Sequence, residues 1–231
     1  PLPTLTNGEV LVEVLCCTLC GSDLHTFAGH RSVSSPLILG HEILGRVCAL
    51  PEDGEVLDWS GDRLEIGKRV TWSIVIGCGA CFFCCRAMPQ KCDRLRKYGH
   101  QQLSPRHSLS GGLSEYCHLV PGTAVFTVAD DLSDATVCPA NCATATVAAA
   151  LRVAGDVHDG VVLIQGAGML GLTAAAMTRS RGAREVITVD INTTRLAQAE
   201  RFGATRMFKV DEEDSLRRFV QRATNGRGVD V

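Results

Sequence analysis

Four cysteines in one short segment constrain the fold of this chain most. They follow the spacing Cys-x2-Cys-x2-Cys-x7-Cys, at Cys78, Cys81, Cys84 and Cys92. Four thiolates spaced in this way can close a tetrahedron around one zinc ion, with Zn–S bonds of ~2.3 Å and no open position. The pattern predicts a structural zinc site. The alternative is two disulfides, which a cytosolic setting disfavours.

The composition is that of an ordinary globular protein. The chain has 231 residues, of which 45% are hydrophobic and 21% charged, and its net charge is −2. We therefore expect neither a basic face for nucleic acid nor a general attraction to anionic membranes. No apolar stretch, Thr144–Val153 included, has the length that we expect of a membrane span. The twelve cysteines do not suggest a small disulfide-rich domain, because the chain is too long for that class.

The second part of the chain alternates short aliphatic runs with helical patterns. We predict strands over 161–164, 186–189 and 207–210, and helices over 170–180, 192–202 and 212–223. This alternation is typical of a parallel, doubly wound sheet. The acidic run 211–214 is expected to open the last helix. Residues 229–231 resemble the start of a further strand, so we expect the second half of a six-stranded dinucleotide fold to be missing.

The first part is rich in loops and carries most of the cysteine, histidine and proline. We predict strands over 10–15, 46–50, 68–72 and 113–120, the first of them after a turn at Asn7–Gly8. Irregular strands with long connections favour a distorted, barrel-like domain. The fold class is therefore α/β, with a distorted β-barrel followed by a partial parallel sheet.

A glycine-rich turn follows the first aliphatic strand of the second part and opens a helix. It has the pattern G-x-G-x-x-G, with Gly166, Gly168, Met169, Leu170 and Gly171. In this context the pattern predicts a dinucleotide site, with the pyrophosphate at the helix N-terminus. Asp190, 19 residues after Gly171, can accept both ribose hydroxyls of NAD and repel the extra phosphate of NADP. Arg195 can lie along the adenosine, or it can weaken that repulsion. The alternative is a glycine turn that binds nothing.

Three further segments complete the pattern: Cys20–His25, Gly40–Glu42 and Cys142–Val147. A lone cysteine or histidine is more often a core or surface residue than a ligand. In this order, together with the cysteine quartet and the glycine turn, these segments resemble the zinc-dependent medium-chain alcohol dehydrogenases over nearly the whole chain. The resemblance implies a GroES-like catalytic domain over 1–143 and the first half of a Rossmann domain over 144–231. It also implies hydride transfer between an alcohol or polyol and NAD, with two zinc ions.

The resemblance also implies roles for single residues. Cys20, His41 and Cys142 would bind the catalytic zinc, the open Cys2His set known for alcohol dehydrogenase. In polyol dehydrogenases the residue equivalent to Glu42 ligates zinc instead, and Cys142 would then be a free thiol. Ser22 would touch the substrate oxygen and pass a proton through the nicotinamide ribose to His25, and Asp23 would orient His41. The alternatives are a surface histidine for His25 and a helix cap for Asp23.

Some residues depart from the family pattern or receive no role. Gly21 stands where some relatives carry a basic residue that meets the cofactor pyrophosphate. The remaining cysteines are expected to be incidental thiols: Cys16, Cys17, Cys48, Cys85, Cys117 and Cys138. Five histidines are assigned no role: His30, His100, His107, His118 and His158.

The leading hypothesis is a cytoplasmic, NAD-dependent zinc alcohol or polyol dehydrogenase that acts as a homodimer or homotetramer. Threonine 3-dehydrogenase or a sorbitol-type polyol dehydrogenase is the alternative within the family. The segment 139–146 also resembles a bacterial subgroup labelled as phosphonate-catabolism associated. The hypothesis from another class is a non-catalytic zinc- and nucleotide-binding fragment.

Overall fold

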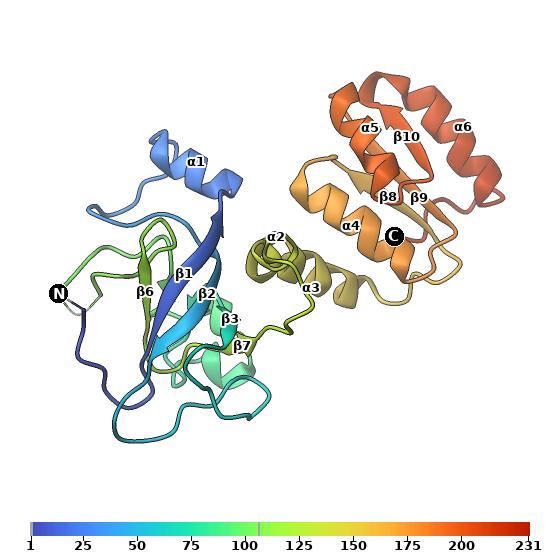
Figure 1. The fold of residues 1–231 in the computed structure, drawn as a ribbon. Coiled ribbons are helices and arrows are strands. Elements are labelled where there is room, and N and C mark those ends of the chain that lie inside the picture. The colour runs from blue at the N-terminus through green and yellow to red at the C-terminus, as the bar shows by residue number, and fades with distance from the viewer. Residues whose placement is uncertain (1, 106) are drawn as a thin grey trace. The chain divides into compact units, whose positions relative to one another are not determined.

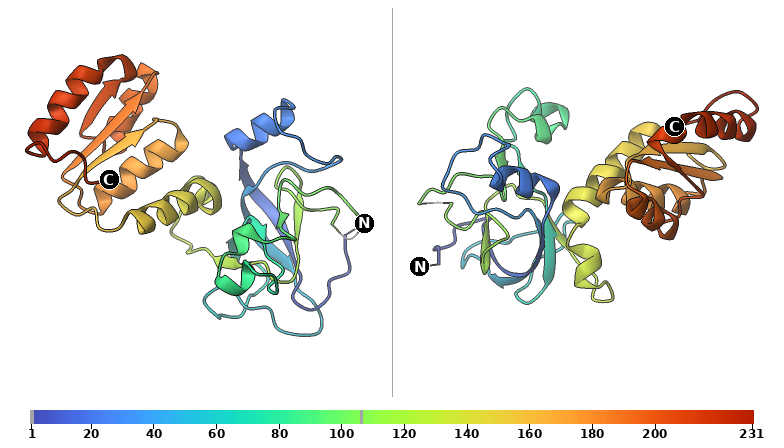
Figure 2. Two further views of the ribbon diagram at one scale, coloured as in Figure 1. Left: turned by 180° about the vertical axis from the view of Figure 1, so that it is seen from behind. Right: turned by 90° about the horizontal axis from the view of Figure 1, so that it is seen from above.

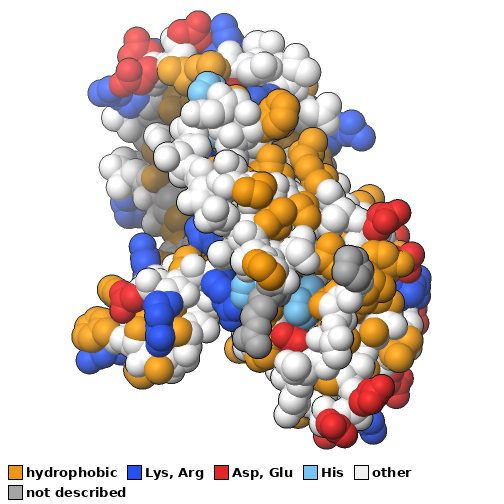
Figure 3. Space-filling model, turned by 90° about the vertical axis from the view of Figure 1, so that its left-hand side faces the viewer, with side chains coloured by type: hydrophobic (Ala, Val, Ile, Leu, Met, Phe, Trp, Pro, Cys, Tyr) orange, Lys and Arg blue, Asp and Glu red, His pale blue; other side chains and the backbone are white. Residues whose placement is uncertain are grey.

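The computed structural model describes residues 2–105 and 107–231. The chain forms two compact units, Pro1–Cys142 and Ala143–Val231, one residue away from the boundary expected from the sequence (Figures 1 and 2). The larger sheet of the first unit is antiparallel and the sheet of the second is parallel. The face drawn in Figure 3 carries acidic and basic side chains, with hydrophobic and neutral ones between them.

The first unit is built on a five-stranded antiparallel sheet. Its strands, in spatial order, are β6 (Tyr116–Leu119), β1 (Val10–Thr18), β2 (Glu42–Ala49), β3 (Arg69–Trp72) and β7 (Val125–Thr127). The strands predicted from the sequence are confirmed as β1, β2, β3 and β6, with shifted ends, whereas β7 was not predicted. β-Branched and aromatic side chains fill the core, among them Val12, Ile43, Val47 and Trp72. The sheet therefore gives the first unit a rigid base.

Two local elements of the first unit position residues of the sites described below. The helix α1 (Gly21–Phe27) follows β1. The short strands β4 (Val75–Ile76) and β5 (Arg96–Lys97) pair antiparallel and close the loop that carries the cysteine quartet. Within this loop the chain makes two 3-10 turns, η1 (Cys84–Arg86) and η2 (Pro89–Lys91).

A long helical run spans the division between the units. It consists of α2 (Asp134–Val137), the π-helical turn η3 (Ala140–Thr144) and α3 (Ala145–Ala154). By length and composition alone this run, Asp134–Ala154, passes as a candidate membrane span, the one such helix among the described residues. The sequence-based expectation that no stretch is long enough was therefore wrong, because the helical run begins at Asp134, ten residues before the apolar stretch that starts at Thr144. One such helix is weak evidence for a membrane span, since the core helix of a soluble protein passes the same test.

The second unit is a parallel sheet with helices between its strands. Its strands lie in the order β10 (Arg206–Lys209), β9 (Glu185–Asp190) and β8 (Val161–Gln165). The connecting helices are α4 (Met169–Ser180) and α5 (Thr193–Arg201), and η4 (Val210–Glu212) leads into α6 (Glu213–Ala223). The predicted strands and helices are confirmed, each to within one residue at its ends.

Helices cover both faces of this parallel sheet. α4 and α5 contact each other and pack against the strands. Met207 of β10 packs into the cluster beneath α5, whereas the ring of the next residue, Phe208, lies 5.9 Å from that of Phe219 in α6. Because successive strand residues point to opposite faces, α6 covers the face opposite α5. This arrangement is the doubly wound sheet that the sequence predicts.

The last residues run beside β8, on the side opposite β9. The Asp230 amide donates to the Val161 carbonyl, and the Leu163 amide donates to the Val231 carbonyl, at 2.8 and 2.9 Å. The two bonds follow the same order along both segments, so residues 230–231 run beside β8 in the same direction without forming a regular ladder. The Asp230 carboxylate also accepts from the Val161 amide.

The glycine turn gives a stability test. A Cβ on Gly171 would lie 1.7 Å from the Gly166 carbonyl oxygen, whereas a Cβ on Gly168 would meet nothing within 4 Å. We expect Gly171→Ala to lower the free energy of unfolding by about 2 kcal/mol or more, because α4 cannot approach β8 without a clash. Gly168→Ala is the matched control and should change it by less than about 0.5 kcal/mol. Urea unfolding of both variants measures this, and equal losses would contradict the packing argument.

Candidate functional site

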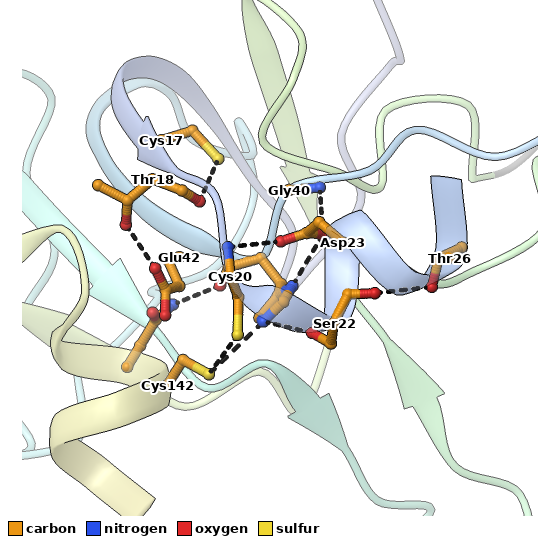
Figure 4. Close-up of polar contacts among 11 residues, drawn as sticks. Cys17, Thr18, Cys20, Ser22, Asp23, Thr26, Gly40, Glu42 and Cys142 are labelled. Atoms are coloured by element: carbon orange, nitrogen blue, oxygen red, sulfur yellow. Dashed lines mark hydrogen bonds and ion pairs between the residues drawn. The ribbon is translucent and has the colours of Figure 1, made fainter. Parts of the chain in front are cut away.

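Four potential metal ligands from three distant segments meet in the first unit. They are Cys20, His41, Glu42 and Cys142, and their ligand atoms all lie within 4.8 Å of one another (Figure 4). Cys142 Sγ lies 4.0 Å from Cys20 Sγ and 3.5 Å from His41 Nε2. His41 and Glu42 are buried, and the two cysteines are half-buried. The structure thus brings together all the ligand candidates that the sequence proposed for this centre.

The pairing of β1 with β2 explains why Cys20 and His41 meet. Thr18, the last residue of β1, pairs with Glu42, the first residue of β2. Cys20 therefore leaves β1 at the same end of the sheet at which His41 enters β2. Gly40 precedes His41 with φ of +89°, and a Cβ there would lie 2.7 Å from Cys17 Sγ. Only glycine fits this entry without displacing its neighbours.

Cys142 reaches the cluster from the π-helical turn. π-Helical turns of this kind are frequent at functional sites. The neighbouring Asn141 fixes the turn, because its side-chain Nδ2 donates to the carbonyls of His41 and Trp72 at 3.1 and 3.0 Å. Cys138 adds a bond from its thiol to the Glu42 carbonyl. Sequence reasoning missed Asn141, and no local pattern marks it, since its partners lie on β3 and next to β2.

A buried carboxylate orients the histidine of the cluster. Asp23 is 1% exposed and accepts from His41 Nδ1 at 3.1 Å, from the Gly40 amide at 3.1 Å and from the Cys20 amide at 3.0 Å. Because a carboxylate can only accept, Nδ1 carries the proton and Nε2 is left with a lone pair that faces Cys142. The bond to Cys20 also caps α1. Both interpretations of Asp23, orienting group and helix cap, therefore describe the same side chain.

The distances in the cluster fit a tetrahedral metal ion. Bond lengths of ~2.3 Å to sulfur and ~2.0 Å to nitrogen give edges of about 3.8 Å between two sulfurs and about 3.5 Å between sulfur and nitrogen. The observed edges are 4.0 and 3.5 Å. Burial, followed by the charges of Cys20 and Glu42, raises the pKa of Cys142 to about 12, so a thiolate at this position requires a cation beside it. The donor set of sulfur and imidazole is the one that zinc prefers.

Glu42 lies within the same cluster. Its side chain is 2% exposed, and its Oε2 accepts from the Thr18 hydroxyl at 2.6 Å. Glu42 and Cys142 are therefore both within reach of one ion, and each of the two ligand sets considered from the sequence is compatible with this geometry.

The two members of the expected proton path lie on α1. Ser22 Oγ lies 3.4 Å from His41 Nε2, on the side of the cluster that opens to a cleft. His25, three residues further along the helix, is exposed, and its Nδ1 lies 3.4 Å from Nδ1 of His30. The sequence assigned no role to His30, yet its ring is in contact with that of His25.

His100 requires a correction, because the sequence assigned it no ligand-like surroundings. Its ring centroid lies 4.9 Å from that of His41, and it groups with Asp23 and His41 within 4.8 Å. Burial, followed by the charge of His41, lowers the pKa of His100, and the charges of Lys97 and Arg31 act in the same direction. No local sequence pattern predicts that His100 lies at the cluster, because the strand β5 and the turn after it bring it there.

A cleft of about 460 Å³ lies beside the cluster. Ser22, His41 and His100 face it from the cluster side. The other lining residues are apolar or basic: Val33, Ile74, Val75, Arg31 and Lys97. A small molecule in this cleft can therefore reach the histidine and the serine hydroxyl together.

The cysteine quartet forms a second cluster in the loop between β4 and β5. Cys78, Cys81, Cys84 and Cys92 have their sulfurs within 4.8 Å of one another, with 3.9 Å between Cys81 and Cys92. The backbone amides of Cys78 and Arg94 donate to Cys92 Sγ at 3.2 and 3.3 Å. All twelve cysteines of the chain are described, and all are free. The expected alternative of two disulfides is therefore not what this structure contains.

The quartet is prepared to hold thiolates. A hydrogen bond from the Ala80 backbone, together with the Arg94 side chain, lowers the pKa of Cys78 to about 6. Hydrogen bonds from the backbone of Cys84 and Asp93 lower the pKa of Cys81. Burial raises the pKa of Cys84 to about 11, which a bound cation would reverse. The set of four sulfurs fits a zinc ion with no open position.

The glycine turn of the second unit and Asp190 are directly connected. Gly166 has φ of +102°, which favours glycine, and the next amide, that of Ala167, donates to Asp190 Oδ2 at 2.6 Å. The Asn192 amide donates to Oδ1 at 2.7 Å. These two bonds, with a smaller contribution from Arg195, hold the pKa of Asp190 below its usual range. The carboxylate stays charged at neutral pH beside the turn.

Asp190 and Arg195 line one cavity of about 720 Å³ next to the glycine turn. Gly166 and Val210 are also in its wall. Met169 and Leu170 begin α4, and their side chains are 60% and 51% exposed. These side chains have no hydrogen-bond donor, so a phosphate at this position would meet the backbone amides at the start of the helix. The cavity and the helix start together suit an adenosine with phosphates attached.

Comparisons with known proteins agree with these features. The family described as "Alcohol dehydrogenase GroES-like domain" matches residues 6–130, and the family "Zinc-binding dehydrogenase" matches residues 170–231. Sorbitol dehydrogenase of Bacillus subtilis is 30% identical over all of this chain and 62% of its own length. L-Threonine 3-dehydrogenase of Edwardsiella ictaluri is 29% identical over all of this chain and 64% of its own length.

A solved structure is similar over the same extent. An alcohol dehydrogenase of Thermotoga maritima superposes with a TM-score of 0.92 at 33% identity, covering 99% of this chain and 64% of the other. The chain thus spans 62–64% of the length of these relatives. The chain belongs to the zinc-dependent medium-chain alcohol dehydrogenase family.

Proposed function

We propose that this protein is a zinc-dependent oxidoreductase that transfers a hydride between an alcohol or polyol and NAD, giving the aldehyde or ketone. One observation carries the proposal. Cys20, His41 and Cys142 converge within 4.8 Å of one another, with Glu42 in the same cluster, beside a cleft that a small molecule can enter. If these two thiols, the imidazole and the carboxylate only stabilised the fold, they would not require a cleft beside them.

Two zinc sites are part of the proposal. Cys20, His41 and Cys142 would hold the catalytic ion, with Glu42 as the alternative ligand, and the cysteine quartet would hold the structural ion. When bound, the catalytic ion supplies a Lewis acid for the oxygen of the alcohol. The quartet has no open position and ties a loop that is otherwise held by the two-residue pairing of β4 with β5.

The chain's own residues orient ligands and move a proton. Asp23 holds the ring of His41, so that Nε2 faces the cluster. Ser22 Oγ lies beside this nitrogen and accepts the proton that the alcohol releases. His25, one turn further along α1, is exposed and would exchange protons with solvent. The release of a proton beside a buried cluster requires such a path.

The cofactor is assigned from the second unit. Asp190 would accept the ribose hydroxyls of NAD, and the amides at the start of α4, from Gly168 to Gly171, would face the pyrophosphate. The negative charge of Asp190 disfavours the additional phosphate of NADP. Arg195 lines the same cavity and would lie along the adenosine.

Related activities remain within the same proposal. Threonine 3-dehydrogenase and sorbitol-type polyol dehydrogenase are alternatives, since relatives with both names are similar over the whole chain. The twelve free thiols suit a reducing compartment and support a cytoplasmic location. A non-catalytic zinc- and nucleotide-binding protein is disfavoured by the joint presence of the ligand cluster and the cleft.

Cys142→Ala and Glu42→Gln separate the two ligand sets. If Cys142 is the third ligand, Cys142→Ala should lower kcat by at least about 100-fold and remove one zinc ion, because a tetrahedral site cannot lose a protein ligand and stay tightly bound. Glu42→Gln should then keep both ions. NADH absorbance and metal analysis of the purified variants measure the two effects. Full activity of Cys142→Ala, with loss of zinc in Glu42→Gln, would assign the ligand role to Glu42.

The structural site has a matched control next to it. We expect two zinc ions per chain in the protein, one in Cys81→Ser, and two in Cys85→Ser. Cys85 neighbours the quartet but lies outside the four-sulfur cluster and is exposed. Metal analysis counts the ions, and the melting temperature should fall in Cys81→Ser alone. Loss of an ion in both variants, or in neither, would contradict the assignment.

Asp190→Ser tests the choice of cofactor. The variant should bind NAD at least about tenfold more weakly, while NADP binding should stay the same or improve, because the carboxylate that attracts one ribose and repels the other phosphate is gone. Calorimetric titration with both nucleotides gives the ratio. An equal loss for both would show that the carboxylate does not select between them, and the melting temperature reports any damage to the glycine turn.

A further inference from the structure

The cleft beside the cluster is positively charged. Arg31 and Lys97 line it, and no acidic side chain is among its lining residues. The two acids of the neighbouring cluster already have donors, since Asp23 accepts three hydrogen bonds and Glu42 accepts one from Thr18. The positive charges in the cleft therefore do not neutralise these acids by direct contact.

Arg31 and Lys97 are exposed, and neither side chain has a partner in the part of the chain that the structure describes. Among residues 2–105 and 107–231, no hydrogen bond or ion pair is formed by the side chain of either residue. Some cations of the first unit are paired, as Arg69 is with Asp134 and Arg63 with Glu55, whereas Arg31 and Lys97 share one cleft without a partner among the described residues. Two unpaired cations in the wall of one cleft give that cleft a positive potential that attracts anions.

The backbone places Lys97 at the cleft by register. Lys97 pairs with Val75 across the β4–β5 ladder, and both residues line the cleft. Arg31 comes from the segment after α1, the helix that carries Ser22. His100, whose ring centroid lies 4.9 Å from that of His41, lines the same cleft as Lys97 and Arg31. An anion held by them is thus next to the site at which the alcohol hydroxyl would sit.

We propose that the substrate is an alcohol that carries a carboxylate, phosphate or phosphonate group, which Arg31 and Lys97 bind while its hydroxyl faces His41 and Ser22. This proposal rests on the proposed dehydrogenase function and names its substrate class. The guanidinium of Arg31 can bind two oxygens of any of these three groups, and Lys97 acts as a point charge. Val33, Ile74 and Val75 supply an apolar wall for the carbon chain between the two ends.

Three alcohols that differ in one group test the substrate class. 1,3-Butanediol, 3-hydroxybutyrate and 2-hydroxypropylphosphonate share the fragment CH3–CH(OH)–CH2– and end in a neutral, a carboxylate and a phosphonate group. With the zinc-loaded protein and NAD, kcat/KM should be at least about tenfold higher for one or both anions than for the diol. The anion with the higher kcat/KM shows whether the site prefers a carboxylate or a phosphonate. Equal or higher kcat/KM for the diol would overturn the proposal and leave the dehydrogenase function standing.

Single substitutions link the preference to the two cations. Arg31→Gln and Lys97→Gln should each lower kcat/KM for the better anion by about tenfold, through KM, and lower it less for the diol. Lys97→Arg and Arg31→Lys should restore part of the loss. Lys68→Gln removes an exposed cation outside the cleft and should change neither value. Equal losses for anion and diol would mean a structural effect, and a raised KM for NAD would place the cofactor on these cations; either result would overturn the proposal.

A binding measurement is independent of turnover. Butyrate and propylphosphonate lack the hydroxyl, and calorimetric titration should show at least one of them binding to the protein and binding at least about tenfold more weakly to Lys97→Gln. No binding of either compound, or equal binding to both proteins, would overturn the proposal. Anion binding without oxidation of any of the three alcohols would count against the dehydrogenase function and support the anion site.

Discussion

The carboxylate of Asp23 is the interaction on which the site depends. It is buried, and its two oxygens accept from one side chain and two backbone amides that come from both sides of the cluster. A buried carboxylate is stable only when such donors are present, and each donor is in turn fixed by it. The start of α1, the entry into β2 and the ring of His41 are therefore one unit. Because the Cys20 amide is part of this unit, the backbone that carries the Cys20 thiol has a defined position.

The remaining ligand reaches this unit by a different principle. Cys142 lies on a π-helical turn, which widens the helix by one residue per turn and re-aims the side chains within it. Asn141 ties that turn to the backbone at both His41 and Trp72. The two thiols are thus placed by separate sets of hydrogen bonds, one around Asp23 and one around Asn141. This preorganisation limits how far the ligands must move when an ion binds.

The sequence predicts the second unit more fully than the first, for physical reasons. The strands of the parallel sheet are buried on both faces and separated by helices, so their apolar runs are continuous and their ends are marked by glycine and acidic residues. In the first unit, β4 and β5 have two residues each and β7 has three, which is too short for a periodic pattern. The π-helical turn after Pro139 joins segments that the sequence suggests are separate.

The residues of the candidate sites also differ in how far the sequence predicts them. The cysteine quartet is local, so spacing alone finds it, and the three distant ligand candidates were found through the family resemblance. His100, Asn141, Arg31 and Lys97 were not found, because each reaches the site through a turn or a strand register that no short pattern encodes. The choice between Cys142 and Glu42 is open for another reason. Both side chains are close enough, and the decision depends on the ion's preference between sulfur and oxygen.

The quartet and the cleft are connected through the β4–β5 ladder. The quartet lies in the loop that this ladder closes, with Cys78 two residues after β4 and Cys92 four residues before β5. Val75 and Lys97 form one pair of the ladder and face the cleft together. A two-residue pairing is weak by itself, since a short isolated hairpin is marginally stable at best. An ion bound by four thiolates would fix the loop and with it the register that brings Lys97 and His100 to the cleft. In that case the structural site would shape the wall of the cleft as well as stabilise the loop.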